Sequence, residues 1–239
     1  MSLGFPLGEP ALRHLPEPEI DICLLGRERE PVVIIDGFSG MVDTLRQQAS
    51  AARFARAEAY YPGIRAKADP SYLDLRRDVL LGILQRTFGL QQQVRLGSAQ
   101  FSLVTCPGEA LVAKQRIPHY DDTSGKVIAI MHYLADANTG GTAFYRHRRT
   151  GFEKITTARR PEYDSALIAD DAEFGEPPAR YHYGISNRYE MIGEVEARPD
   201  RFILYRGWLL HSGVIPENAD LSVDPGEGRL TINMFLIGS

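Results

Sequence analysis

The hydrophobic pattern of the first third of the chain predicts one strand followed by two helices. Val32 to Ile35 form a short apolar run that Asp36-Gly37 ends, which is typical of a buried strand. Apolar residues then recur at helical spacing over residues 39–54 and again over residues 71–88. Ser71 is suitably placed to cap the second helix, and Gly89 follows its last apolar residue.

After residue 95 the pattern becomes that of strands. Short apolar runs alternate with turn sequences such as Pro107-Gly108. The predicted strands cover residues 99–105, 127–134, 142–145, 189–196, 201–205 and 229–237. The polar stretch 152–183 lies between them and contains one predicted short helix, over residues 162–172.

This order of elements predicts a mainly β fold with α-helices. Two helices followed by many short strands favour a β-barrel or jelly roll, with the helices packed on one sheet. Residues 1–30 are rich in proline and charge, so we expect an irregular arm with at most one short strand. The remaining sequence contains no linker, and we expect residues 31–239 to form a single domain.

The composition is that of an ordinary globular protein. Of the 239 residues, 24% are charged and 44% are hydrophobic, and the formal net charge is −4. This content excludes wholesale disorder, and the lack of a basic excess argues against nucleic-acid binding. The apolar runs are too short to cross a bilayer and no secretory leader opens the chain, so we expect a cytoplasmic protein. Two cysteines are too few for a multi-thiolate metal site.

The segment Pro118-His119-Tyr120-Asp121 carries the most distinctive chemistry. Side chains alternate in an extended chain, so His119 and Asp121 offer an imidazole and a carboxylate on the same face. His211, just beyond an apolar strand, is the best candidate for a third ligand. Two histidines and one carboxylate form the facial triad of non-haem Fe(II) oxygenases, which leaves the opposite face of the metal open. The alternative is a hydrogen-bonded histidine in a surface turn.

The last predicted strand offers a partner for a second ligand group. Arg229 and Thr231 share one face of this strand. A guanidinium fork suits a terminal carboxylate, to which the neighbouring hydroxyl adds a hydrogen bond. A dicarboxylate that binds the metal at one end would need such a clamp at its other end. The alternative is that Arg229 is a surface charge at a strand end.

Together these residues resemble the Fe(II)/2-oxoglutarate-dependent dioxygenase superfamily, whose fold is a double-stranded β-helix, or jelly roll. The resemblance runs from about Ala99 to Leu236. It is closest to prolyl-hydroxylase-like members, through Tyr133-Leu134 and the later Gly140-Gly141 and Phe144.

The resemblance implies a role for each candidate residue. The iron ligands would be His119, Asp121 and His211. Arg229, Thr231 and Tyr133 would hold the distal carboxylate of the cosubstrate 2-oxoglutarate, while O2 takes the remaining position on the Fe(II). The implied reaction is hydroxylation of an unidentified small molecule or peptide, with release of succinate and CO2.

Within this superfamily the chain is similar to an uncharacterised bacterial domain family. The similarity covers nearly the whole chain and brings no known substrate. It rests on four phrases: Tyr61-Pro62-Gly63, Gln115-Arg116-Ile117-Pro118-His119, Phe144-Tyr145-Arg146-His147 and Gly228-Arg229-Leu230-Thr231.

Two features depart from the prolyl-hydroxylase pattern. Arg229 follows His211 by 18 residues, about twice the usual spacing, and residues 217–227 are consistent with an inserted loop. Arg206 is therefore an alternative clamp. The asparagine common after Tyr-Leu is Ala135 in this chain.

Other polar residues have less specific interpretations. His132 alternates with Tyr133, so we expect it to face away from the site as a structural residue. His147 lies in a short basic run, which favours a solvated loop over a basic rim. His182 is a candidate for a substrate lid, and Arg116 is a candidate partner for either a substrate carboxylate or an acidic side chain.

Two other functions are compatible with the same barrel. One is a cupin-like metal-dependent isomerase or hydrolase, which would act without 2-oxoglutarate. The other is a non-catalytic jelly-roll binding module, against which the complete set of ligand and clamp residues argues.

Overall fold

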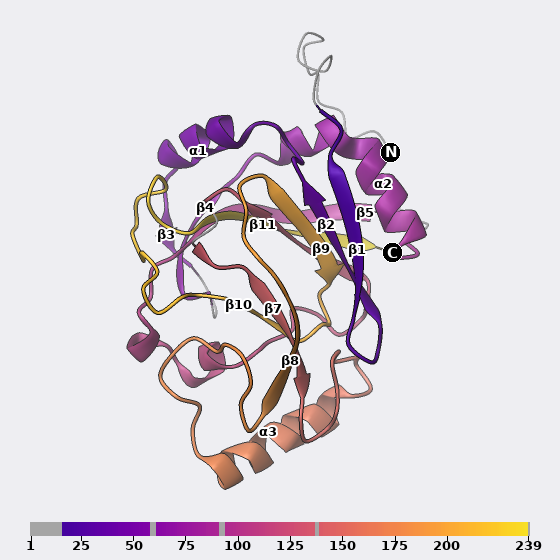
Figure 1. Cartoon of the computed structure of the whole chain (residues 1–239), viewed down its shortest axis with the longest axis vertical. Coiled ribbons are helices and arrows are strands. Elements are labelled where there is room, and N and C mark those ends of the chain that lie inside the picture. Colours follow the sequence, from indigo (N-terminus) through magenta and orange to yellow (C-terminus); the bar gives the residue numbers. More distant parts are fainter. Residues whose placement is uncertain (1–15, 58–60, 91–93, 137–138, 239) are drawn as a thin grey trace.

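The computed structural model describes residues 16–57, 61–90, 94–136 and 139–238 (Figure 1). Its strands are β1 (Glu19–Leu25), β2 (Glu30–Asp36), β3 (Ala55–Arg56), β4 (Gly63–Lys67), β5 (Val94–Val104), β6 (Val127–Tyr133), β7 (Thr142–His147), β8 (Tyr189–Val195), β9 (Arg201–Arg206), β10 (His211–Gly213) and β11 (Leu230–Gly238). Its helices are α1 (Val42–Ser50), α2 (Arg77–Arg86) and α3 (Arg160–Phe174), with short 3₁₀ helices η2 (Pro70–Arg76), η3 (Gly108–Ala110) and η4 (Ala113–Arg116).

Two antiparallel sheets form the body of the protein. The larger has eight strands in the order β1-β2-β9-β6-β11-β5-β4-β3, and the smaller has the order β10-β7-β8. Strands β5 and β6 follow each other in the chain, yet β11 lies between them. This interleaving of strands from distant parts of the chain confirms the predicted jelly roll.

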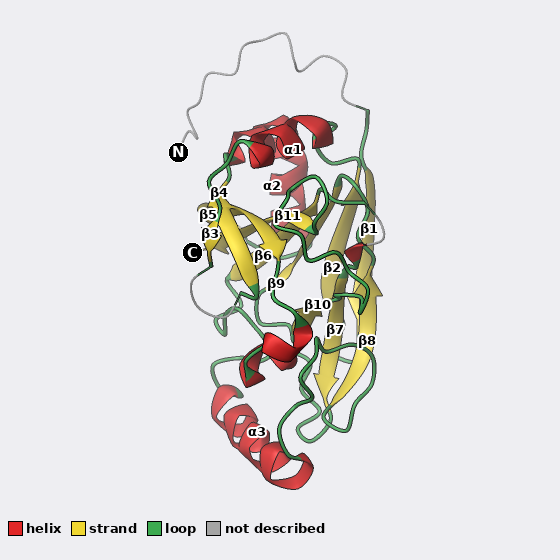
Figure 2. Cartoon of the chain, turned by 90° about the vertical axis from the view of Figure 1, so that its left-hand side faces the viewer, coloured by secondary structure: helices red, strands yellow, loops and turns green. Residues whose placement is uncertain are grey.

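One face of the large sheet packs against helices. Apolar residues of β5, β6, β9 and β11 form a continuous core with α1, η2 and α2. Leu45 of α1 and Ile83 of α2 are both buried in this core. Figures 1 and 2 show α1 and α2 together at one end of the molecule and α3 at the other. The predicted helical packing on one sheet is therefore confirmed.

The opposite face of the large sheet looks toward the small sheet. Tyr133 of β6 and Tyr205 of β9 pack there against Phe144 of β7 in a second core. Because side chains alternate along a strand, residues two apart from these share the same inner face. Thr231 of β11 is paired directly with Tyr133, which places it in the same row.

Several boundaries differ from the sequence-based prediction. Within the expected irregular arm, residues 19–25 form strand β1, which pairs along its whole length with β2. Residues 1–15 lie outside the described part. The first helix is shorter than predicted and starts at Val42, and the second segment begins as η2 before α2. Asp69, rather than Ser71, caps η2, since its carboxylate accepts a hydrogen bond from the Ser71 amide at 3.0 Å.

Strands β3, β4 and β10 were not predicted, because each is short and lacks an apolar run. Strand β4, with the sequence GIRAK, nevertheless pairs with five residues of β5. Among the described residues, no helix is long and apolar enough to cross a membrane.

Candidate active site

His119, Asp121 and His211 come together although His211 follows His119 by 92 positions in the chain. Their ligand atoms all lie within 4.8 Å of one another. The Asp121 carboxylate stands between the rings, with Oδ1 at 3.8 Å from Nε2 of His119 and Oδ2 at 3.6 Å from Nε2 of His211. Three donor atoms at these separations can converge on one cation.

The backbone fixes this cluster from two sides. The amide nitrogens of His119 and His211 each donate to the carbonyl oxygen of the other at 2.8 Å. The Asp121 amide donates to the carbonyl of Gly207 at 2.7 Å. His211 itself begins β10, which pairs with β7 in the small sheet. The donor atoms are therefore held by main-chain hydrogen bonds and do not need a ligand to bring them together.

The His211 ring has one nitrogen available for a ligand. Its Nδ1 lies 2.8 Å from the carbonyl oxygen of Leu209, and a carbonyl only accepts, so Nδ1 carries the proton. This leaves Nε2, the atom that faces Asp121, with a free lone pair. A backbone carbonyl that orients a histidine in this manner is the usual support of a metal ligand.

The surroundings favour uncharged imidazoles. Burial, reinforced by the nearby His211, lowers the pKa of His119 to about 4. Burial also lowers the pKa of His211 to about 4. Burial raises the pKa of Asp121, and His119 and Arg65 oppose part of that shift. The His119 side chain is 54% exposed, so solvent reaches about half of it.

Arg229 lies on the inner side of the jelly roll near this cluster. It is 3% exposed, and one terminal nitrogen donates to the carbonyl of Gly141 at 2.9 Å. A Cβ built on Gly213, two residues beyond His211, would stand 3.9 Å from the Arg229 Nη2. The Nε atom of Arg229 is buried and has no hydrogen-bond partner in the described structure. A buried donor of this kind is costly unless a ligand satisfies it.

The other two predicted clamp residues lie beside Arg229 but have protein partners. The Arg229 guanidinium carbon lies 5.8 Å from the centre of the Tyr133 ring. The Tyr133 hydroxyl is 2.7 Å from the Thr142 hydroxyl. The Thr231 hydroxyl donates to Oδ1 of Asn233 at 2.8 Å, and it can still accept a bond from elsewhere.

Tyr61 and Arg65 are two further candidate site residues, to which the sequence analysis assigned no role. Among the described residues the buried Tyr61 hydroxyl has no partner with hydrogen-bond geometry. Burial raises its pKa, while Arg229, Arg65 and the nearby Ser102 hydroxyl oppose that shift. The phrase Tyr61-Pro62-Gly63 contributed to the sequence resemblance but pointed to no function. Only the pairing of β4 with β5 brings this segment into the sheet that contains β11, one strand away from it.

Arg206, the alternative clamp, points elsewhere. Its terminal nitrogens donate to the carbonyls of Gly125 at 2.6 Å and Phe88 at 2.7 Å. Its Nε lies 3.6 Å from a carboxylate oxygen of Glu30. These partners bind the guanidinium outside the inner face, because Arg206 alternates with the inward-facing Tyr205.

His132 lies on the opposite face of β6 from Tyr133, as its position in the strand predicts. It is fully buried between the Tyr72 hydroxyl, 3.1 Å from Nδ1, and the Asp200 carboxylate, 2.9 Å from Nε2. Burial lowers its pKa, although Asp200 opposes the shift. It links η2 to the large sheet.

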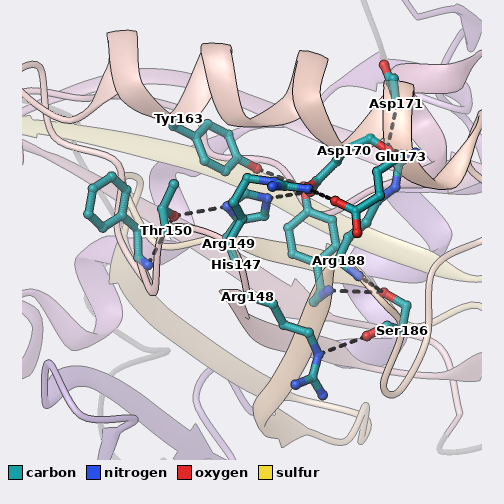
Figure 3. Close-up of polar contacts among 12 residues, drawn as sticks. His147, Arg148, Arg149, Thr150, Tyr163, Asp170, Asp171, Glu173, Ser186 and Arg188 are labelled. Carbon is teal, nitrogen blue, oxygen red and sulfur yellow. Dashed lines mark hydrogen bonds and ion pairs between the residues drawn. The ribbon is translucent and has the colours of Figure 1, made fainter.

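The prediction that His147 belongs to a solvated loop is wrong. His147 ends β7 and is fully buried, with its Nε2 at 2.8 Å from Asp170 of α3 and its Nδ1 at 2.9 Å from the Thr150 hydroxyl (Figure 3). Arg149 pairs with the same Asp170. The charge run misled the prediction because α3 folds over it and supplies the acids.

Arg116 has protein partners, among them the Glu176 carboxylate at 3.9 Å, and His182 packs against an aromatic ring. Arg116 donates to the carbonyls of Leu111 at 2.8 Å and Pro177 at 3.3 Å. The His182 ring packs against Tyr145, with ring centres 4.9 Å apart, and burial lowers its pKa to about 4. Its Nε2 is buried without a partner in the described structure.

Solved structures share the fold at low sequence identity. HygX from Streptomyces hygroscopicus, with nickel, 2-oxoglutarate and hygromycin B bound, is 16% identical with a TM-score of 0.50, over 90% of this chain and 88% of that chain. The non-heme alpha ketoglutarate dependent epimerase SnoN from nogalamycin biosynthesis is 15% identical with a TM-score of 0.48, over 88% and 80%. The viral collagen prolyl hydroxylase vCPH from Paramecium Bursaria Chlorella virus-1, as its 2OG complex, is 12% identical with a TM-score of 0.45, over 87% and 96%.

At this identity the likeness to HygX establishes the jelly-roll fold. No curated protein matches the sequence. A sequence family described as a family of unknown function (DUF6445) matches residues 16–236, which is most of the chain. The chain therefore belongs to the DUF6445 family.

Proposed function

We propose that this protein is an Fe(II)- and 2-oxoglutarate-dependent oxygenase that hydroxylates a small molecule or peptide. One observation carries the proposal: a His-Asp-His cluster and a buried arginine without a partner at Nε lie on the inner side of one jelly roll. The fold shared with HygX, whose structure holds nickel and 2-oxoglutarate, supports the same class.

The residues present fit a divalent transition metal. His119, Asp121 and His211 offer two nitrogens and one carboxylate, which is the ligand set of the facial triad. The oriented Nε2 of His211 and the low pKa of both histidines keep the nitrogen lone pairs available at neutral pH. His119 is open to solvent, so small molecules can reach the ion from that side.

The surroundings of Arg229 fit the distal carboxylate of 2-oxoglutarate. Arg229 reaches Gly213, two residues from His211, and two residues of a strand span about 7 Å. The Nε of Arg229 and the Tyr61 hydroxyl are two buried donors that lack protein acceptors. A carboxylate oxygen would satisfy both of them, and an arginine–carboxylate bond is among the strongest available.

When bound at this site, Fe(II) would supply the redox chemistry by which a substrate C–H, O2 and 2-oxoglutarate become the alcohol, succinate and CO2. The chain itself binds and orients 2-oxoglutarate, and it excludes water from the site. Arg229 and Tyr61 hold the distal carboxylate, and the backbone bridge of His119 and His211 keeps the ligand nitrogens in place. Tyr205 and Phe144 provide an apolar wall, with the Tyr205 ring 4.8 Å from that of His211.

The direct test is turnover of 2-oxoglutarate without a substrate. Purified protein with Fe(II), ascorbate and labelled 2-oxoglutarate should release CO2 and succinate slowly, and His119→Ala should abolish this release. Asp121→Asn tests the carboxylate ligand, and Asp122→Asn is its matched control. The Asp122 carboxylate accepts hydrogen bonds from the Ser124 amide and hydroxyl, each at 2.6 Å, instead of facing the rings. A wild-type protein that takes up Fe(II) but never binds 2-oxoglutarate would overturn the proposal in favour of a cupin-like metal enzyme.

A further inference from the structure

Arg65 of β4 belongs to the inner face that carries the candidate clamp. It pairs with Ser102 of β5, and Ser102 pairs with Thr231 of β11, which in turn pairs with Tyr133. Directly paired residues of antiparallel strands project to the same side of a sheet. Arg65 therefore lies in one row with Thr231 and Tyr133, on the side that faces the metal cluster.

The guanidinium of Arg65 has no carboxylate at ion-pair distance among the described residues, and its Nε is buried without a hydrogen-bond acceptor. Burial lowers its pKa, which Tyr61 and the more distant Asp121 only partly oppose. Its Cζ lies 4.0 Å from the centre of the Tyr61 ring, so the ring holds it from one face. By contrast, Arg146, Arg188 and Arg201 lie 2.5, 2.6 and 2.6 Å from carboxylate oxygens. Partial burial of a cation without an anion in direct contact costs free energy, and an anionic ligand would offset that cost.

Its place in this row puts Arg65 on the inner face, in the neighbourhood of the metal ligands. Its charge is near enough to alter the pKa of both His119 and Asp121, each of which is shifted mainly by burial. Asp121 nonetheless forms its close contacts with the two histidines. An anion bound to Arg65 would therefore lie beside the metal position without displacing Asp121.

Arg65 and Arg229 are separate sites for anions. Strand β5 lies between β4 and β11, so their backbones are about 10 Å apart at one level of the sheet. Tyr61 lies near both guanidinium groups, which both lower its pKa against the larger effect of burial. One dicarboxylate that is held at Arg229 and at the metal leaves Arg65 for another molecule.

We propose that Arg65 binds an oxyanion of the substrate, a carboxylate or a phosphate, beside the metal ligands. The inference rests on the proposed oxygenase function and names its substrate class as acidic molecules. The fork of the guanidinium sets the position of that group, while the Tyr61 ring fixes the plane of the fork.

Calorimetric binding tests the inference with defined probes. Protein loaded with Ni(II) and N-oxalylglycine, an unreactive analogue of 2-oxoglutarate, is titrated with benzoate, phenyl phosphate and the neutral benzamide. We expect at least one of the two anions to bind 10-fold or more tightly than benzamide. Arg65→Gln should abolish this preference, and Arg65→Lys, which keeps the charge but not the fork, should retain part of it.

Lys67→Gln is the matched control, because Lys67 shares the strand and face of Arg65 but is exposed. It should leave the preference unchanged. The inference fails if wild type does not prefer an anion, or if Arg65→Gln keeps the preference. It also fails if Arg65→Gln weakens binding of Ni(II) or N-oxalylglycine as strongly as it weakens binding of the anion. If wild type binds neither Ni(II) nor N-oxalylglycine, the oxygenase proposal fails instead, and titration of the metal-free protein still decides the role of Arg65.

Discussion

His119 and His211 are joined by their backbones, since each amide donates to the carbonyl of the other at 2.8 Å and the ring centres are 4.3 Å apart. This link is independent of the side chains. The geometry of the candidate metal site is therefore built into the strands, and the metal-free protein already holds the donor atoms together.

A substitution at His119 should therefore lower the affinity for the metal without lowering the stability of the metal-free protein. His119→Ala removes one nitrogen ligand but keeps both backbone bonds, and the ring it removes is half exposed. We expect affinity for Fe(II) to fall by more than about 100-fold, beyond the loss that follows removal of an outer partner of a metal ligand. The melting temperature of the metal-free protein should change little. Anaerobic metal titration and calorimetry measure the two effects, and a large loss of metal-free stability would contradict the argument.

Arg229→Ala should raise the 2-oxoglutarate concentration needed for half-maximal turnover by about 10- to 100-fold, since a charge-assisted hydrogen bond contributes about 1.5–3 kcal/mol. Arg206→Ala should leave this concentration unchanged, because Arg206 is bonded to the carbonyls of Gly125 and Phe88. Arg160→Ala is a further control that should leave this concentration unchanged, because Arg160 is exposed. The opposite result for Arg206 and Arg229 would assign the clamp to Arg206.

Tyr61→Phe should weaken 2-oxoglutarate binding by about 5- to 10-fold, because it removes one neutral donor worth about 1 kcal/mol. The ring beneath Arg65 would remain, so the fold and metal binding should be preserved. Binding of N-oxalylglycine to the Ni(II)-loaded protein measures the effect directly. An increase in stability without any loss of binding would show that the hydroxyl serves no ligand.

His147→Ala should destabilise the protein without affecting metal binding. It breaks the buried contact with Asp170 that attaches α3 to β7, and the contact with Thr150 in the turn after β7. The loss of such a hydrogen bond, together with the cavity left behind, predicts a decrease of about 2–4 kcal/mol in the free energy of unfolding. Urea denaturation measures it, and Arg148→Ala is the control because Arg148 forms an exposed bond to the Ser186 carbonyl. Reduced metal affinity at unchanged stability would contradict this structural role.

Stability of the metal-free protein should decrease as the pH falls from 7 to 5. The pKa of His182 is about 4 in the folded protein because of burial, below the ordinary 6.5, and burial lowers the pKa of His132 and His147 as well. A depressed folded pKa stabilises the fold above pH 6.5, and this contribution is lost as the pH falls toward the folded value, by at most about 1.4 kcal/mol per pH unit for each histidine. Thermal unfolding between pH 5 and 8 measures the trend, and His182→Asn should reduce it. A melting temperature that rises on acidification would refute it.

The fold class and the candidate ligand set could be predicted from the amino-acid sequence. The alternation of side chains along a strand is a local property, so the apolar runs predicted most of the large sheet. This alternation also placed His119 and Asp121 on one face. The same alternation separated His132 from Tyr133. The choice of residue types also limited the chemistry, because imidazole and carboxylate ligands indicate a metal with nitrogen and oxygen ligands.

The partners that these residues contact could not be predicted from the sequence and are visible only in the folded chain. The sequence left Arg206 open as an alternative to Arg229, and the structure distinguishes them by their partners, the carbonyl of Phe88 for Arg206 and that of Gly141 for Arg229. His147 is buried because α3 covers it, which its own basic neighbours could not indicate. Arg65 became a candidate because β4 joins the sheet beside β5. The register of the strands and the layering of the sheets bring together residues that are far apart in the chain. Both depend on the packing of the whole molecule and not on the spacing within one segment.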